Sequence, residues 1–125
     1  MTTNNLPTDF TELISWQKAR ILVLDIYKLT DSWRDFGLKD QLRRAVVSIM
    51  NNIAEGYSRR TAKETLRYFD IAIGSCVEVK SMTYLLEDLE LQDPEQIIAL
   101  RNKVMEVHKI AFGYVKYLKH KISDS

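Results

Sequence analysis

The stretch TAKETLRYFDIAIGSCVEVKSMTYLLEDLEL, residues 61–91, decides the fold. It opens with the pattern T-x-x-E, in which Thr61 and Glu64 form a capping box that satisfies the free amides of a helix start. From there a helix can continue to Leu91, over roughly 30 residues and ~45 Å at 1.5 Å per residue. The segment from Ile71 to Val77 carries no charge, which suits a helix that packs against more than one neighbour.

Two helices are expected before this stretch. The first begins near Asp9, which can form a capping box with Glu12, and runs to about Thr30. The second covers residues 38–55 with apolar side chains at helical spacing, and Gly56 is expected to end it in the left-handed conformation.

A fourth helix is expected after it. Asp93, Pro94 and Gln96 supply a capping acid, a proline at the first helical position and a reciprocal glutamine, so this helix runs from there to about Lys119. Polar residues flank the helices at both ends of the chain. We therefore expect a flexible N-terminal tail over residues 1–9, a bundle over residues 10–120 and a flexible C-terminal tail over residues 121–125.

The composition agrees with one helical domain. The 125 residues are 46% hydrophobic and 28% charged, with only two prolines and four glycines, and runs of alternating β-branched residues are absent. Short connections favour antiparallel neighbours. The sequence thus predicts an all-α, up-down-up-down antiparallel four-helix bundle.

A reducing cytoplasm of bacterial type is the expected compartment. The single cysteine, Cys76, cannot form an internal disulfide, and residues 1–9 lack the pattern of a secretory signal. The longest uncharged run falls far short of the ~20 apolar residues that span a bilayer, so no membrane association is expected.

Residues typical of an active site, a cofactor or a metal centre are not found at productive spacing. Glu106 and His108 are two residues apart on a helix and point away from each other, so they cannot share an ion. Cys76 has no cationic neighbour in sequence and is expected to pack in the core. His108 is expected to pack in the core or at an interface. The four glycines are isolated and form no phosphate-binding loop. We expect no enzyme, no cofactor and no metal.

The fourth helix carries a clue to assembly. Its apolar residues cover an arc of roughly 200°, about twice the stripe that packing on one core requires. Self-association would cover the excess, while the alternative is that the third and fourth helices are central within the monomer. The members of the arc are Ile97, Leu100, Val104, Met105, Val107, Ala111, Phe112, Tyr114, Val115 and Leu118.

Net charge is only +1, yet the charges are unevenly placed. A cluster of cations on the second helix and the turn after it, interleaved with Tyr57 and Tyr68, is suited to phosphate contacts and base stacking. The alternative is a set of solvated arginines beside a structural seam. The candidate nucleic-acid contacts are Arg43, Arg44, Arg59, Arg60, Lys63 and Arg67.

The second helix also bears a polar stripe at spacings of three and four residues. We interpret it as a structural network that positions the turn at Gly56, either inside the bundle or across a subunit boundary. Its members besides Arg44 are Gln41, Ser48, Asn52 and Glu55.

Several short motifs follow one another along the chain. In order they are Ser15-Trp16-Gln17-Lys18-Ala19, Ile26-Tyr27, Gly37-Leu38, Gln41-Leu42-Arg43-Arg44-Ala45, Ser48-Ile49, Asn52-Ile53-Ala54-Glu55-Gly56 with Arg59, and Ile71-Ala72-Ile73-Gly74-Ser75 with Glu78. Over about residues 10–119 the sequence resembles the bacterial four-helix-bundle family of proteins encoded in intervening sequences of 23S ribosomal RNA genes. Members of that family are similar to the accessory protein of diversity-generating retroelements, a ring-like homopentamer with a positively charged surface that partners a reverse transcriptase. The resemblance implies a homopentamer and favours a role related to nucleic acid.

Together these observations predict a non-enzymatic, self-associating bundle that acts as a binding or scaffold component. Its expected partners are copies of itself, RNA or DNA through the basic cluster, and a protein partner. The alternative function is a protein–protein interaction module that binds no nucleic acid, in which the acidic segment from Glu87 to Glu95 and the basic turn dock on protein surfaces.

Overall fold

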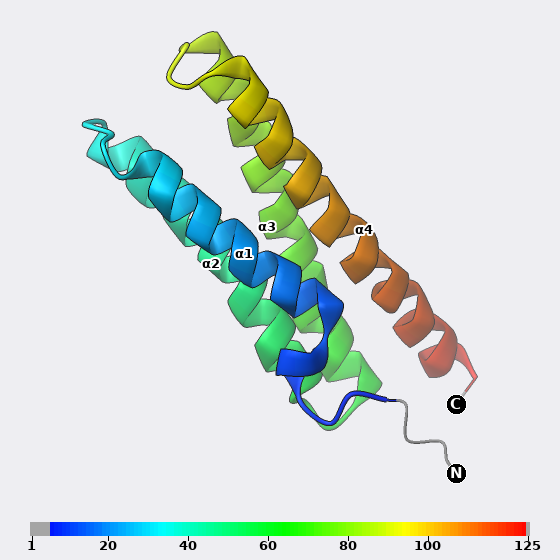
Figure 1. Ribbon diagram of the computed structural model, residues 1–125. Helices are drawn as coiled ribbons and strands as arrows, with labels where there is room; N and C mark the ends of the chain where they lie inside the picture. Colours follow the sequence, from blue (N-terminus) through cyan, green and yellow to red (C-terminus); the bar gives the residue numbers. More distant parts are fainter. Residues whose placement is uncertain (1–5, 125) are drawn as a thin grey trace.

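The computed structural model describes residues 6–124, and this part of the chain forms one short 3-10 helix and four α-helices (Figure 1). In chain order they are η1 (Phe10–Glu12), α1 (Ile14–Thr30), α2 (Phe36–Tyr57), α3 (Ala62–Asp88) and α4 (Pro94–Ser123).

The four α-helices form an antiparallel bundle in which α1 contacts α2 and α4, and α3 contacts α2 and α4. Each helix sends one apolar stripe to the centre. Leu22 and Ile26 of α1, Ile49 and Ile53 of α2 and Phe69 of α3 are among the fully buried side chains of this core. The predicted up-down-up-down four-helix bundle is confirmed.

Two of the predicted helices start at the expected residues, although the side chain of Asp93 makes no capping bond to α4 and the Thr61–Glu64 box forms only one of its two bonds. The hydroxyl of Thr61 accepts a hydrogen bond from the Glu64 amide at 3.2 Å, and Pro94 is the first residue of α4. The capping box of Asp9 and Glu12 also forms, but it caps η1, and α1 begins after it at Ile14.

Gly56 does not have the predicted role. It lies inside α2, which continues to Tyr57, and no glycine among residues 6–124 has a positive φ. A Cβ at Gly56 would stand 2.8 Å from the Cβ of Tyr68 and 3.0 Å from the ring of Phe69. Glycine is therefore required because α2 and α3 approach closely, not because the helix ends there.

The end of α3 differs from the prediction as well. The helix stops at Asp88, three residues before Leu91, because Glu90 adopts the left-handed conformation with a φ of 53°. The amide of Leu91 then donates to the carbonyl of Leu86 at 3.3 Å, and the amide of Glu90 donates to the carbonyl of Glu87 at 3.1 Å. These two bonds form a Schellman motif, which commonly uses glycine at the left-handed position.

The segment before η1 and the last turn of α4 lie at the end of the bundle that holds the α2–α3 turn (Figure 1). The helix α4 passes the expected end at Lys119, so residues 121–123, predicted as tail, are helical. At the other terminus the hydroxyl of Tyr57 donates a hydrogen bond to the carbonyl of Pro7. Residues 1–5 and 125, also predicted as tail, lie outside the described residues. Within residues 6–124 no helix has both the length and the hydropathy that crossing a bilayer requires.

Candidate nucleic-acid interface

The polar stripe of α2 forms a seam with α3 inside one chain. The hydroxyls of Ser48 and Ser75 are 2.8 Å apart, and the Nδ2 of Asn52 donates to the carbonyl and hydroxyl of Ser48 at 2.9 and 3.0 Å. The Nε2 of Gln41 reaches the carboxylate of Glu78 at 3.5 Å. The bonds of Ser48 and Gln41 link α2 to α3, and those of Asn52 lie within α2, so these three members of the stripe have partners inside one chain.

Arg43 is part of the packing between α1 and α2. Its Nε donates to the Thr30 hydroxyl at 2.9 Å, its Nη2 donates to the carbonyl of Tyr27 at 3.1 Å, and its guanidinium lies 4.1 Å from the centre of the Tyr27 ring. A cation bonded to the last turn of α1 offsets the negative end of that helix dipole. Arg43 thus serves the fold, since its Nε and Nη2 are both bonded to the last turn of α1.

Arg44 is exposed and lies far from the cations of the α2–α3 turn. It forms an ion pair with Asp40 one helical turn earlier, at 2.8 Å. On α2 it stands thirteen positions before Tyr57, which is about 20 Å at 1.5 Å per residue. The predicted cluster therefore divides into two groups at different heights on the bundle.

Arg59 stands at the α2–α3 turn and is held by its neighbours. Its Nη2 pairs with the carboxylate of Glu55 at 2.6 Å, its Nε donates to the carbonyl of Glu55 at 3.1 Å, and its guanidinium lies 5.2 Å from the ring centre of Tyr68. Glu55, predicted as part of the structural network, therefore fixes the direction of Arg59.

The remaining cations of the turn are unpaired. Arg60, Lys63 and Arg67 are exposed, and within residues 6–124 their side chains make no hydrogen bond or ion pair. Lys121 joins them from the last turn of α4, because the antiparallel arrangement brings the C-terminal end of α4 to this end of the bundle. We call Arg59, Arg60, Lys63, Arg67 and Lys121 the basic end.

A hollow of about 320 Å³ opens at the basic end. Arg59, Arg60 and Lys121 lie around it together with the side chains of Tyr57 and Tyr117. Proteins that bind single-stranded nucleic acids combine cations, which contact the phosphates, with aromatic rings, on which the bases stack.

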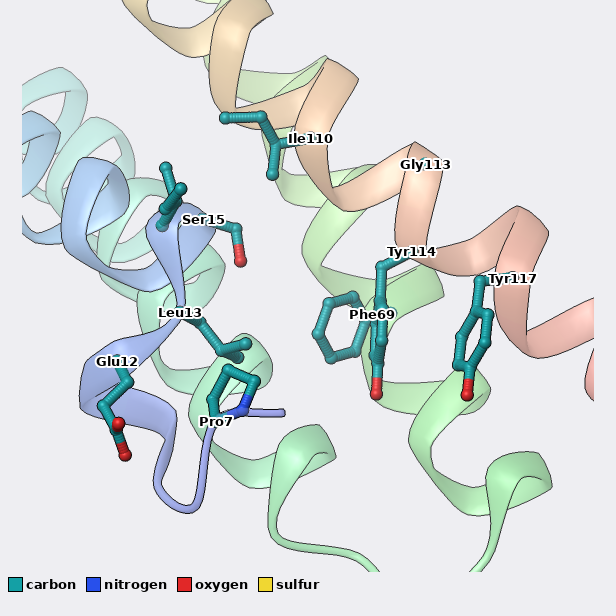
Figure 2. A pocket seen from close by; sticks show the side chains of 10 residues that line it. Pro7, Glu12, Leu13, Ser15, Phe69, Ile110, Gly113, Tyr114 and Tyr117 are labelled. Atoms are coloured by element: carbon teal, nitrogen blue, oxygen red, sulfur yellow. The ribbon is translucent and has the colours of Figure 1, made fainter. Parts of the chain in front are cut away.

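An apolar groove of about 440 Å³ continues from this hollow between the start of α1 and the C-terminal half of α4 (Figure 2). Leu13, Phe69, Ile110, Tyr114 and Tyr117 are among the residues that line it. The rings of Tyr114 and Tyr117 are stacked, with centres 5.6 Å apart and planes at 22°, and Figure 2 shows them side by side. The groove thus extends the aromatic surface of the hollow.

The hydroxyls of Tyr57 and Tyr114 stay neutral at physiological pH. Burial, reinforced by Glu12 and Tyr117, raises the pKa of Tyr57, and burial, reinforced by Tyr57 and Tyr117, raises the pKa of Tyr114. Neutral rings add no negative charge that would repel a phosphate beside the arginines.

The opposite end of the bundle is acidic. Residues 85–95 contain five acids and no Lys or Arg, whereas residues 59–67 contain four Lys or Arg and one acid. Of these acids Glu87 pairs with Arg101, whose guanidinium also bonds to the Thr83 hydroxyl at 2.9 Å and lies 3.7 Å from the ring centre of Tyr84. The charge is therefore polarised along the bundle axis although the net charge is only +1.

The residues considered for chemistry have packing roles. Burial raises the pKa of the Cys76 thiol to about 12, which keeps it protonated and unreactive. The ring of His108 lies edge-on to Phe112 with centres 6.4 Å apart, and Glu106 pairs with Lys18 of α1 at 3.1 Å. Among the described residues no group of three potential metal ligands comes together.

The apolar arc predicted for α4 is only partly used by the core. Val104, Val107 and Ala111 are buried, whereas Met105 and Phe112 each keep 44% of their surface exposed. They are accompanied by large apolar side chains of α1 and α3 that are also about half exposed. The described chain therefore presents apolar surface that its own fold leaves uncovered.

The family model of the 23S rRNA-intervening sequence protein matches residues 11–113. A solved structure described as a protein with unknown function from the S23 ribosomal protein family, from Bacteroides thetaiotaomicron, is similar in fold with a TM-score of 0.78. It is 22% identical in sequence, and the match covers 82% of this chain and 99% of that one. No curated protein matches the chain.

Proposed function

Since the chain belongs to the family of 23S rRNA-intervening sequence proteins, we propose that it is a non-enzymatic, self-associating binding component of the cytoplasm. In this proposal the chain forms a homopentamer and contacts RNA or DNA through the basic end. The observation that carries the nucleic-acid role is the meeting of unpaired cations and stacked tyrosines at one end of the bundle.

The electrostatics of the basic end support phosphate binding. Among residues 6–124 no acid pairs with Arg60, Lys63 or Arg67, so a phosphate would gain their attraction without displacing one. Arg59 is already oriented by Glu55 and Tyr68, which lowers the entropy that is lost on binding. Repetition of this end around a ring would multiply the contacts of a long ligand.

The aromatic rings support contact with unpaired bases. Tyr117 is 50% exposed and stacked on Tyr114, so its outer face is open to a flat ligand. Stacking of one base on such a ring contributes about 1–3 kcal/mol and tolerates any sequence. The chain would thus prefer unpaired over fully duplex nucleic acid.

The experiment is a titration of a labelled RNA hairpin with an unpaired loop, and of an unrelated duplex DNA, at low and at physiological salt. We expect the hairpin to bind more tightly, with an affinity that falls steeply as salt rises. The double variant Arg60→Ala/Lys121→Ala should reduce the slope of log K against log salt by about 2, because each lost phosphate contact reduces it by about 1.

The matched control is Lys28→Ala/Arg34→Ala. It also removes two exposed cations, but from the end of the bundle opposite to the basic end. The control should bind as the unmodified chain does. Equal loss in both double variants would mean that net charge alone governs binding. If neither nucleic acid binds even at low salt, the nucleic-acid role fails, and the chain is then a protein–protein interaction module whose charged ends dock on protein surfaces.

A further inference from the structure

Two separate apolar surfaces lie on the outside of the bundle. The first, the α1 face, consists of Ile14, Ile21 and Leu24, which are between 52% and 59% exposed. The second, the α3–α4 face, has exposed fractions between 44% and 53% and consists of Val77, Tyr84, Ile98, Met105 and Phe112.

Helical spacing makes the α3–α4 face continuous. Ile98, Met105 and Phe112 are seven residues apart, so they lie along one stripe of α4, and Val77 and Tyr84 do the same on α3. Arg101 is three residues after Ile98 and four before Met105, so it lies next to the α4 stripe. Its guanidinium covers the ring of Tyr84 in the α3 stripe at 3.7 Å, so Arg101 lies between the two stripes. The two stripes are therefore neighbours.

The area of the α3–α4 face is a substantial part of a stable interface. Five large side chains, each about half exposed, offer on the order of 500 Å² if a fully exposed one offers roughly 200 Å². A specific interface buries about 800 Å² on each partner. The apolar centre of such an interface is thus present, and polar neighbours would supply its rim.

The two faces point in different directions. On α4 the side that meets α1 is marked by the ion pairs of Glu106 with Lys18 and of Lys103 with Asp25. The α4 stripe instead adjoins α3, as the position of Arg101 requires. The α1 face therefore lies beyond these ion pairs, on another side of the bundle from the α3–α4 face.

A closed ring with an odd number of subunits needs two different faces on each subunit, because identical faces pair subunits two by two. We infer that the α1 face of one copy packs on the α3–α4 face of the next copy. This inference rests on the proposed ring assembly and adds which surfaces form it. The partner of each face is therefore a neighbouring copy of this chain.

The first test measures the mass of single-face variants by sedimentation at a fixed protein concentration. Leu24→Glu on the α1 face and Met105→Glu on the α3–α4 face should each yield monomers that keep the helical circular dichroism of the unmodified chain. Asn51→Glu, which adds the same charge to an exposed position of α2, should leave the assembly intact. Ile21→Glu and Ile98→Glu repeat the test if either first variant loses its helical signal.

The second test asks whether the faces pair with each other. Three variants are made in a Cys76→Ala background: Ile21→Cys, Met105→Cys, and a double variant that carries both. Each is treated with a short bismaleimide. The double variant should give a covalent ladder that ends at five chains, whereas each single variant should stay uncrosslinked.

The outcomes separate the inference from the proposed assembly. A monomeric unmodified chain would refute the assembly itself. An intact assembly in Leu24→Glu or in Met105→Glu would refute only the pairing of these faces. Efficient cross-linking of Met105→Cys alone would also overturn the pairing, because it would place two α3–α4 faces against each other.

Discussion

The close approach of α2 and α3 at Gly56 allows a quantitative prediction. In Gly56→Ala the added methyl would stand 2.8 Å from the Cβ of Tyr68 and 3.0 Å from the Phe69 ring. Because Cβ is fixed to the backbone, relief requires the helices to separate, and such overpacking costs about 1–3 kcal/mol. The better helix propensity of alanine returns about 1 kcal/mol. We expect a net loss of up to about 2 kcal/mol in the free energy of unfolding and a Tm lower by up to about 8 °C.

Gly74 supplies the matched control for this substitution. It also lies inside a helix, but a Cβ there would have no atom within 4 Å. Gly74→Ala should therefore raise the free energy of unfolding by about 0.5–1 kcal/mol. The assay is urea unfolding followed by circular dichroism, at one protein concentration because assembly contributes to stability. If Gly56→Ala gains as much stability as Gly74→Ala, the close contact of α2 and α3 at Gly56 is wrong.

Three further predictions concern the fold. Arg43→Ala should lower the free energy of unfolding by about 1–3 kcal/mol through the lost bonds to α1, while Arg44→Ala should change it by less than about 1 kcal/mol, both measured in urea. Glu90→Gly should raise the Tm, because it relieves a positive φ that costs about 1–2 kcal/mol; an unchanged or lower Tm would contradict this. The buried Cys76 thiol has its pKa raised from 9.0 to about 12, so ionisation favours the unfolded chain and stability falls as pH rises from 9.0 towards 12. Cys76→Ala should lose stability less steeply over that range in the same unfolding assay.

Local signals in the sequence were enough to predict the helices. Thr61 caps α3 and Pro94 starts α4 as their patterns indicate, because caps depend on residues within one turn. Gly56 was misread because a glycine after an apolar run also fits a helix end. Its real role depends on Tyr68 and Phe69 in the next helix, which no local pattern reveals.

The candidate site could be predicted only in part. Arg60, Lys63 and Arg67 lie exposed at one end as the charge cluster indicates. Arg43 belongs to the same stretch of basic residues, yet its bonds to Thr30 and Tyr27 depend on how α1 ends. The proximity of Lys121 to Arg60 follows from the antiparallel topology, so the predicted fold itself was the signal that could have found it.

Self-association is the central claim, and the mass of the unmodified chain in solution tests it most directly. Sedimentation equilibrium over a dilution series is the measurement. The account predicts one species of five times the 14.6 kDa of the chain, held down to micromolar concentration. A single species of 14.6 kDa at these concentrations would contradict it, and the half-exposed apolar faces would then need another partner.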